Sequence, residues 1–511
     1  MKKMYLLFIC FSLLTPQLQF AQTVNGEIIS DQNSLTVLKV WGNHQERGYA
    51  YGYLLADKIK DVYEGYLVPQ FGNGLANAKL MIQQGQVFNI DQEYITEAQA
   101  IFNGITDAGV SISNGDYLDI LVANTFLDLM GINENFGSAK LKNGCSSLMT
   151  WGDATTGSVD AGKAYVSRHL DWTASPYLTN NQVVLIHLPS ENDEQPWIMI
   201  GFAGQMSVLS GVNNGGQAAF QHMLSDFNES SVMNMPYTPI WFSLRRALEK
   251  YDYNNDGTQN VSDIRSALTA STNGFSDGYI ITALAGSNQI YDSLIAMVAE
   301  VTPNAPTHVF RYNDYEDQIP GDNLYAANYE IKRNDHHHYC SRYNSIATSF
   351  TDSTNISMAD NWDKMRLYSN SGSGNIQFMQ FCPDYRMLVF AWYHNGQPAY
   401  QNNPDTFYLD ELFSPPVAIR QPKTYSQKRS MKLRPNPANT EITAEIFLSN
   451  NSKLLLEIFD SNFNKIKEII IPEKGKGLHQ FKFSLEGRPA GVYIINISGK
   501  GFSISEKFVK Y

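Results

Sequence analysis

Hydrophobic and polar residues alternate in two different ways along the chain, and the change falls close to residue 144. Residues 34–136 mainly show helical spacing, for example across 46–66, where Gly48, Ala50 and Gly52 permit close packing. After Asn143 the chain changes to short apolar or alternating runs bounded by turn-forming residues, which is typical of strands. These runs are 145–151, 163–170, 182–188, 197–202, 207–212 and 217–223.

The order of these segments predicts the fold class. Asn213-Asn214-Gly215-Gly216 is a strong hairpin signal. Residues 241–251 and 262–270 have the pattern of helices, after which strands return up to about residue 412. A helical segment followed by strands, a helical insert and strands again predicts an α+β protein with two antiparallel sheets between helical layers.

The end of the chain has a different character. A polar stretch predicts a linker at 416–430, and residues 431–511 contain short β-runs at the intervals of a small β-sandwich. From Arg420 onward there are 16 Lys and Arg against 8 Asp and Glu, whereas the whole chain carries −12. We therefore expect a mainly helical segment at 22–144, a second segment at 145–415, the linker, and a separate basic module.

Residues 1–21 have the layout of a secretory signal peptide. Lys2 and Lys3 precede an apolar run at 4–14, and Ala21 offers a small residue for the peptidase. That run is too short to span a bilayer, and no later segment is apolar enough to do so. We expect an exported protein without a transmembrane anchor, and the acidic main body argues against a nucleic-acid partner.

Export also changes how the cysteines are interpreted. Cys10 leaves with the signal peptide, so the mature chain keeps Cys145, Cys340 and Cys382. An odd number in an exported protein predicts one disulfide and one free thiol. We favour a Cys340–Cys382 bond that leaves Cys145 free, although three pairings are open.

Cys145 opens a predicted strand directly after Gly144, and this position suggests a mechanism. If the bond between Gly144 and Cys145 were cut, Cys145 would carry both a thiol and a free α-amino group, whose ordinary pKa of about 7.7–8.0 suits a general base. The thiol itself could cut the bond by attacking the Gly144 carbonyl, which would give a thioester that water releases. Glycine leaves that carbonyl uncrowded.

Arg168 and Asp171 end the strand predicted to pair with the one that Cys145 opens. Arg168 could stabilise the thiolate and a substrate carbonyl, and Asp171 could accept a hydrogen bond from the new α-amino group. Residues three apart point to opposite faces of a regular strand, so we expect a break or bulge after Arg168.

Asn143-Gly144-Cys145-Ser146-Ser147 and Ser167-Arg168-His169-Leu170-Asp171-Trp172 together resemble the choloylglycine hydrolase and acid ceramidase group. This group includes N-acylethanolamine acid amidase and the isopenicillin N acyltransferase-like proteins. Ser167 and His169 stand where the family has glycine and asparagine. The resemblance implies an αββα N-terminal-nucleophile hydrolase fold over about residues 38–412.

The same resemblance extends to two later segments. Ala327-Asn328-Tyr329 is similar to the family segment whose asparagine donates to the oxyanion, and Ser341-Arg342-Tyr343 is similar to one that places an arginine beside the nucleophile. Ser210-Gly211-Val212-Asn213 is similar to a hairpin that lines such sites. The implied activity is hydrolysis, or acyl transfer, of a linear amide in a small molecule or peptide, without a catalytic cofactor.

The C-terminal module resembles a sorting domain of the type IX (Por) secretion system. The resemblance lies in Leu433-Arg434-Pro435-Asn436-Pro437-Ala438-Asn439, Gly491-Val492-Tyr493 and the closing Lys507-Phe508-Val509-Lys510. It implies that the chain crosses the periplasm, meets the type IX secretion machinery and is secreted or held at the cell surface. A carbohydrate-binding or adhesion sandwich is the alternative.

One loop has the spacing of a calcium site. Its candidate ligands are Asp252, Asn254, Asp256, Thr258 through its carbonyl, and Asp263, and Gly257 stands at the turn of this EF-hand-like pattern. We predict a structural Ca²⁺, with an Asx-rich turn as the alternative. His336-His337-His338 and Cys340 do not favour a zinc or copper site, because consecutive side chains on regular backbone cannot all face one metal.

Two other functions remain open. The first is a papain-like cysteine hydrolase that uses His169 or His222 as base and does not cleave itself. The second is a calcium-stabilised surface protein without enzymatic activity, in which Cys145 is a core residue. We favour the self-cleaving cysteine amidase or acyltransferase, because its motifs occur together and in order.

Overall fold

The computed structural model describes residues 22–132, 144–224, 235–333, 340–351, 354–415, 431–448, 451–460, 465–475, 477–499 and 502–511. The chain divides into two units, Met1–Val417 and Ala418–Tyr511. The predicted signal peptide and linker lie outside the described residues, as do Asn143 and the three consecutive histidines.

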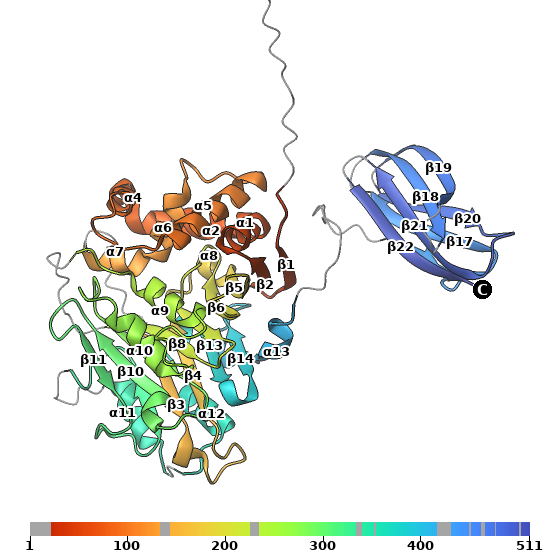
Figure 1. The fold of residues 1–511 in the computed structure, drawn as a ribbon. Coiled ribbons are helices and arrows are strands. Elements are labelled where there is room, and N and C mark those ends of the chain that lie inside the picture. Colours follow the sequence, from red (N-terminus) through yellow and green to blue (C-terminus); the bar gives the residue numbers. More distant parts are fainter. Residues whose placement is uncertain are drawn as a thin grey trace, which may run out of the picture. The chain divides into compact units, whose positions relative to one another are not determined.

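Two sheets form the centre of the first unit (Figure 1). The nine-stranded sheet has the order β1 (Gly26–Gln32), β2 (Leu35–Gly42), β5 (Gln182–Pro189), β6 (Trp197–Phe202), β7 (Ser210–Asn213), β8 (Ala218–Met223), β9 (Tyr279–Leu284), β10 (Ala296–Val301) and β11 (His308–Arg311). The six-stranded sheet has the order β12 (Asn323–Ala326), β3 (Ser146–Thr150), β4 (Tyr165–Asp171), β13 (Asn375–Cys382), β14 (Met387–Trp392) and β15 (Asp405–Tyr408). Neighbouring strands run antiparallel except β2 and β5, which are parallel.

Helices cover the outer face of each sheet (Figure 1). The layer on the nine-stranded sheet contains α1 (His44–Leu54), α2 (Ala56–Val62), α3 (Val68–Phe71), α4 (Leu75–Gln83), α5 (Gln92–Asp107), α6 (Tyr117–Asn124), α7 (Phe126–Ile132), α8 (Pro176–Thr179), α9 (Ile240–Glu249) and α10 (Val261–Thr269). The layer on the six-stranded sheet contains α11 (Ser341–Thr348) and α12 (Met358–Tyr368), and the short α13 (Leu409–Leu412) follows β15. The predicted α+β class and its αββα arrangement are confirmed.

The alternation of apolar residues along the strands explains how the layers pack. On β5, Val184 and Ile186 face the six-stranded sheet, whereas Val183 and Leu185 pack with the helices. Both sets are fully buried. Because successive side chains of a strand point to opposite faces, each central strand must be apolar on both sides. Its sequence therefore appears as a continuous apolar run.

The hydrophobic pattern predicts the wrong type of secondary structure at two places. Residues 35–42 were assigned to the helical segment, but they form β2, which pairs with β1 and with β5. The outer helices α11 and α12 were assigned to strands. Helix α12 has little apolar contrast between its faces, and the missed signal is the capping box in which Ser357 and Asp360 bond each other's backbone.

The second unit is a small β-sandwich, as predicted. One sheet contains β16 (Met431–Arg434), β17 (Glu441–Leu448) and β20 (Gly477–Ser484), and the other contains β19 (Lys465–Lys474), β18 (Ser452–Asp460), β21 (Gly491–Gly499) and β22 (Phe502–Lys510). Alternate residues of β18 and β21, such as Leu456 and Ile495, are buried between the sheets.

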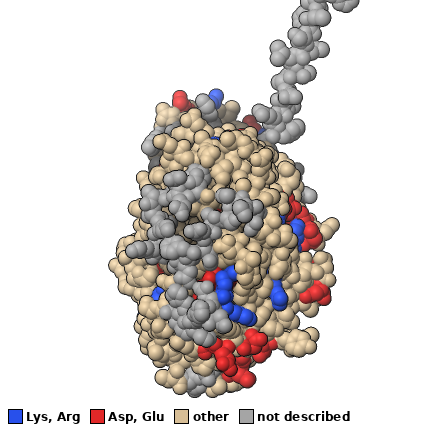
Figure 2. All heavy atoms as spheres, turned by 90° about the vertical axis from the view of Figure 1, so that its left-hand side faces the viewer, with Lys and Arg blue, Asp and Glu red and all other residues tan. Residues whose placement is uncertain are grey.

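Within the described part of the chain, no helix combines the length and apolar composition needed to cross a membrane. On the face shown in Figure 2, basic and acidic side chains of the described residues lie near one another in the lower half of the view.

Candidate active site

Cys145 lies immediately before β3, at the open end of the β3–β4 hairpin. Ser146 pairs with His169 and Ser147 pairs with Arg168 in this hairpin. The pairing brings the Cys145 sulfur to 3.7 Å from Nη2 of Arg168. Cys145 is buried, with 4% of its surface exposed.

Arg168 is fully buried, but its charge is only partly satisfied. Its Nη2 also donates to the backbone oxygen of Gln221 at 3.0 Å, whereas Nε and Nη1 have no partner among the described residues. Burial lowers the pKa of Arg168. Burial also raises the pKa of the Cys145 thiol, and the nearby Arg168 opposes that rise by favouring the thiolate. Unpaired donors of a buried cation are costly, which makes them candidates for contacts with a substrate.

Asp171 approaches Cys145 from the opposite side of β4. Its Oδ1 accepts from Asn375 Nδ2 at 2.8 Å, and its Oδ2 lies 3.4 Å from Nη1 of Arg342. The same Nη1 lies 3.3 Å from the Cys145 backbone oxygen. Burial raises the pKa of Asp171 to about 6, against the opposing effects of Arg342 and Asn375.

The break or bulge predicted after Arg168 is wrong, because β4 contains neither. Strand β4 is continuous through Asp171, but the register shifts on β13, where Asn375 pairs with Asp171 and Gln377 pairs with Leu170. Arg168 and Asp171 therefore keep opposite faces of β4. Cys145 can meet both residues because it lies just before β3. Its sulfur contacts Arg168 directly. Its backbone oxygen contacts Arg342, which forms an ion pair with Asp171.

Asn328 and Arg342 enclose the bond predicted to be cut. Arg342 Nη2 donates to Asn328 Oδ1 at 2.6 Å, and Asn328 Nδ2 donates to the Met223 backbone oxygen at 2.6 Å. A Cβ added to Gly144 would lie 2.4 Å from Arg342 Nη2 and 2.6 Å from Asn328 Oδ1. A larger residue at position 144 would therefore require the Arg342 and Asn328 side chains to shift. All five predicted site residues, Cys145, Arg168, Asp171, Asn328 and Arg342, meet around this bond.

The hydrogen bonds of the two histidines that could serve as alternative bases involve groups other than the Cys145 sulfur. His169 Nε2 bonds to the Met365 backbone oxygen, and its Nδ1 bonds to Asn375. His222 Nε2 lies between the hydroxyls of Ser147 and Thr282, which connects the two sheets. Burial lowers the pKa of His169 to about 3 and that of His222 well below its ordinary value. Neither geometry favours a papain-like pair.

Asn375 and Gln221 contribute to the site but were not predicted. Asn375 holds Asp171, and Gln221 anchors Arg168 through its backbone oxygen. An isolated asparagine or glutamine in a strand belongs to no spaced motif, so the sequence alone does not identify it. Asn375 is identified by the pairing of β13 with β4, and Gln221 by the hydrogen bond between its backbone oxygen and Arg168. The segment Ser210–Asn213, predicted to belong to a hairpin that lines the site, forms β7 of the β7–β8 hairpin, and the Asn213 side chain bonds to Gln217.

The predicted Cys340–Cys382 disulfide is wrong in this structure, where Cys145, Cys340 and Cys382 are all free thiols. Cys340 caps α11, and its sulfur accepts from the Tyr343 backbone N–H at 3.4 Å. Cys382 ends β13 and packs against Tyr165 in a different cluster. The two cysteines belong to separate packing clusters, and the number of cysteines in the sequence does not reveal this separation.

The predicted calcium loop connects α9 to α10. Its carboxylates hold the loop itself: Asp252 accepts from the Asp256 and Gly257 backbone N–H groups, and Asp256 accepts from Thr258. Asp263 serves as the capping-box residue of α10 and also accepts from Gln217 at 2.7 Å. Asn254 Nδ2 donates to Asp256 Oδ2 at 2.9 Å. The loop thus has the hydrogen bonds of an Asx-rich turn, and calcium binding stays a prediction.

A second group of potential metal ligands lies in the helical layer. His44, Glu93, Glu194 and Glu249 have ligand atoms within 4.8 Å of one another. Both nitrogens of His44 are already engaged, at 2.6 Å from Glu97 and 2.9 Å from Glu194.

The charges around His44 are balanced without a metal. Burial lowers the pKa of His44, but its hydrogen bonds to Glu194 and Glu97 outweigh burial and raise it to about 9. A protonated imidazole cannot bind a metal. Arg47 and Arg245 supply further positive charge to Glu194 and Glu97 respectively. We call His44, Arg47, Glu97, Glu194, Arg245 and Glu249 the helical-layer ion cluster.

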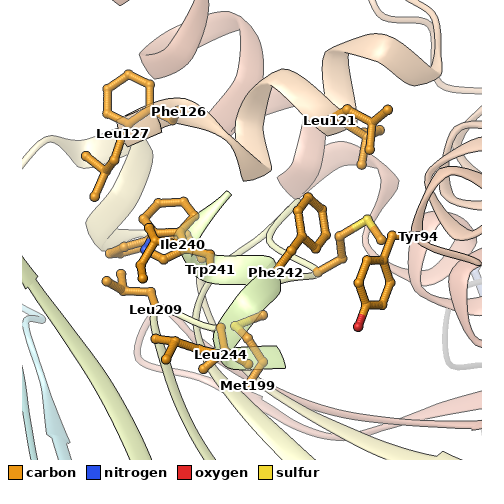
Figure 3. Close-up of a cluster of buried hydrophobic side chains, with 14 of the residues drawn as sticks. Tyr94, Leu121, Phe126, Leu127, Met199, Leu209, Ile240, Trp241, Phe242 and Leu244 are labelled. Carbon is orange, nitrogen blue, oxygen red and sulfur yellow. The ribbon is translucent and has the colours of Figure 1, made fainter. Parts of the chain in front are cut away.

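An apolar pocket opens beside Cys145, between the first helical layer and the nine-stranded sheet. Its walls come from helices α6, α7 and α9 and from the strands and turns below them. Figure 3 shows part of this wall, where Phe126, Leu127, Leu209 and Trp241 lie together. The other lining residues are Val62, Tyr66, Leu67, Ala123, Leu170, Trp172, Leu178, Phe202, Ala203, Gly204, Gln205, Gln221 and Met223.

The comparison with protein families identifies the second unit. Residues 432–511 match the secretion system C-terminal sorting domain. This match confirms the predicted sorting domain and marks the chain as a secreted or cell-surface protein that the type IX secretion machinery handles.

The first unit has more distant similarities. "Protein dcd1B" of Dictyostelium discoideum is 24% identical over 255 residues, which are 45% of this chain and 46% of that protein, so the chain spans about half the length of this curated relative. Among solved structures, the N-acylethanolamine-hydrolyzing acid amidase ortholog of Caenorhabditis elegans has a TM-score of 0.34 and 14% identity, covering 52% of this chain and 100% of that one. A variant of conjugated bile acid hydrolase from Clostridium perfringens has a TM-score of 0.32 and 13% identity, covering 53% and 94%.

Proposed function

We propose that the protein is an exported cysteine amidase that activates itself by cutting the bond between Gly144 and Cys145. The observation that carries this proposal is that the Cys145 sulfur lies 3.7 Å from the buried Arg168, whose Nε and Nη1 have no partner among the described residues, at an apolar pocket.

Self-cleavage needs only groups that surround the bond. The Cys145 sulfur attacks the Gly144 carbonyl carbon, the C–N bond breaks, and the α-amino group takes up the proton. Water then hydrolyses the thioester, which leaves a carboxylate on Gly144 and a free thiol on Cys145. Arg342 and Asn328, whose side chains lie close to Gly144, would stabilise the Gly144 carbonyl during this step.

The mature site repeats this chemistry on a substrate amide. The sulfur attacks the substrate carbonyl, the thiol proton passes to the Cys145 α-amine, and this amine then protonates the departing amine. Arg168 faces the developing negative charge with its free N–H groups, and Asp171 orients the α-amine. Water completes hydrolysis of the acyl thioester, whereas a second amine in place of water would give acyl transfer. The pocket favours an apolar acyl group, because its lining is almost entirely hydrocarbon and aromatic.

Mass spectrometry during turnover tests this proposal. Purified protein is mixed with octanoyl 4-nitroanilide, quenched within seconds and measured intact. We expect two fragments, the second starting at Cys145 and carrying an added octanoyl group, together with released nitroaniline. Cys145→Ala should give one uncut chain without either signal, and the matched control Cys340→Ala should behave as wild type. Acylation or cleavage that persists in Cys145→Ala would contradict the proposal.

A further inference from the structure

Gln221 places one unusual polar group in the apolar pocket. It lies on β8, is 1% exposed, and lines the pocket together with Met223 two positions along the strand. His222 between them points the other way, toward Ser147 and Thr282. This alternation follows from the period of two along a strand, and it fixes the Gln221 side chain on the pocket side.

The orientation of the Gln221 amide is determined by a tryptophan. The indole Nε1 of Trp241 lies 3.1 Å from Oε1 of Gln221. An indole nitrogen can only donate, so the amide oxygen must face it and the amide nitrogen must point away. That nitrogen, Nε2, is buried and has no hydrogen-bond partner among the described residues.

The backbone of the same residue is tied to the catalytic centre. The Gln221 N–H donates to the Leu209 oxygen at 3.0 Å, and its carbonyl accepts from Arg168 Nη2 at 3.0 Å. The unpartnered amide nitrogen therefore belongs to the residue that positions the arginine beside Cys145. Leaving a buried donor unpaired costs stability, and a ligand acceptor that fills the pocket would remove this cost.

We propose that Gln221 is a specificity-determining residue that selects acyl groups carrying an oxygen acceptor on an otherwise apolar chain. A plain hydrocarbon chain fills the same space but leaves Nε2 unpaired. A hydroxyl, ether or oxo oxygen at the matching carbon accepts its hydrogen bond. The assignment of the pocket to the acyl group rests on the proposed function, whereas the preference for an oxygenated chain rests on the pocket itself.

Equilibrium binding of free acids tests the preference without requiring catalysis. Octanoic acid and its 2-, 3- and 4-hydroxy derivatives are titrated into wild-type protein by calorimetry. We expect at least one hydroxy acid to bind roughly tenfold to hundredfold more tightly than octanoic acid, because an unmet donor costs about 1–3 kcal/mol. Gln221→Leu should bring that ratio close to one. Gln221→Met, which keeps an unbranched side chain, should do the same if the leucine variant folds poorly.

Met223→Leu is the matched control, since it changes the same wall of the pocket without changing a donor and should keep the preference. Equal binding of all four acids, a preference that survives in both Gln221 variants, or failure of every acid to bind would overturn the assignment. A wild-type protein that prefers a hydroxy acid but releases no nitroaniline from any acyl anilide would instead contradict the proposed function and leave the Gln221 assignment standing.

Discussion

Arg168 and Arg245 are both fully buried, yet their surroundings differ. Each guanidinium nitrogen of Arg245 has an acceptor, from Glu249, Glu97 or the Met206 carbonyl, and burial is outweighed by these carboxylates so that the pKa of Arg245 is raised. Arg168 keeps two nitrogens without a partner among the described residues, and burial lowers its pKa.

This comparison contrasts buried charges that are fully paired with a buried cation that, under the proposed function, would pair with a substrate. The helical-layer ion cluster connects α1, α5 and α9 through paired groups. The Cys145 site holds an arginine and a carboxylate whose pKa values are shifted by burial in the direction that disfavours their charged forms. Such cost is typical of functional sites, where a substrate later supplies the missing partner.

Removing Arg245 should have the largest effect on stability. Arg245→Met leaves Glu97 and Glu249 buried without their cation, and breaking such a pair costs about 3–5 kcal/mol. Urea denaturation should show this loss, while kcat/KM per folded molecule stays near the wild-type value. An unchanged unfolding free energy would show that the cluster is not structural.

Removing Arg168 should produce the reverse result. Arg168→Met takes donors away from the developing oxyanion, and loss of one such group lowers kcat about 10²–10³-fold. Its unfolding free energy should change little, because most of the guanidinium is unpaired in the folded protein. Wild-type turnover by Arg168→Met would remove the distinction between the two arginines.

Asp171 should make stability depend on pH. Its folded pKa of about 6 lies above its ordinary value of 3.8. The contribution of Asp171 to the free energy of unfolding is therefore fully present below about pH 4 and is lost as pH rises through 6. In the Cys145→Ala background, which keeps the bond intact, the unfolding free energy relative to Asp171→Asn should fall by about 2 kcal/mol between pH 4 and pH 7. A difference that stays flat with pH for Asp171 would refute the assignment.

Gly144→Ala should slow self-cleavage by about tenfold. The new methyl group would press on Arg342 and Asn328, and overpacking of this kind costs about 1–3 kcal/mol. Appearance of the two fragments can be followed by electrophoresis after expression. Gly286→Ala, whose added carbon has only ordinary contacts, is the matched control. Cleavage at the wild-type rate in Gly144→Ala would mean that the enclosed geometry is not the reactive one.

Calcium should have the smallest effect. If Asp252, Asp256 and Asp263 bind the ion, 1 mM CaCl₂ should raise Tm by roughly 2–4 °C over EDTA, and Asp252→Asn should remove the shift. Magnesium at the same concentration is the control. Identical melting curves in calcium and EDTA would leave the loop as the hydrogen-bonded turn that the structure shows.

The sequence predicted the features that depend on local periodicity. The strand at 197–202 and the hairpin at Asn213–Gly216 were found because alternation and turn residues identify them directly. Cys145, Arg168 and Asp171 were proposed from the chemistry of a cut at Gly144, and Asn328 and Arg342 from motif resemblance. Asn375, the free amide of Gln221 and the separate positions of Cys340 and Cys382 were not predicted, because each depends on which strand lies beside which, and this is set by long-range packing.

N-terminal sequencing of the active protein tests the central claim most directly. The account predicts that fully active material contains a fragment whose first residue is Cys145, and that this fragment is missing from the inactive Cys145→Ala variant. Full activity in material whose Gly144–Cys145 bond is intact would contradict it.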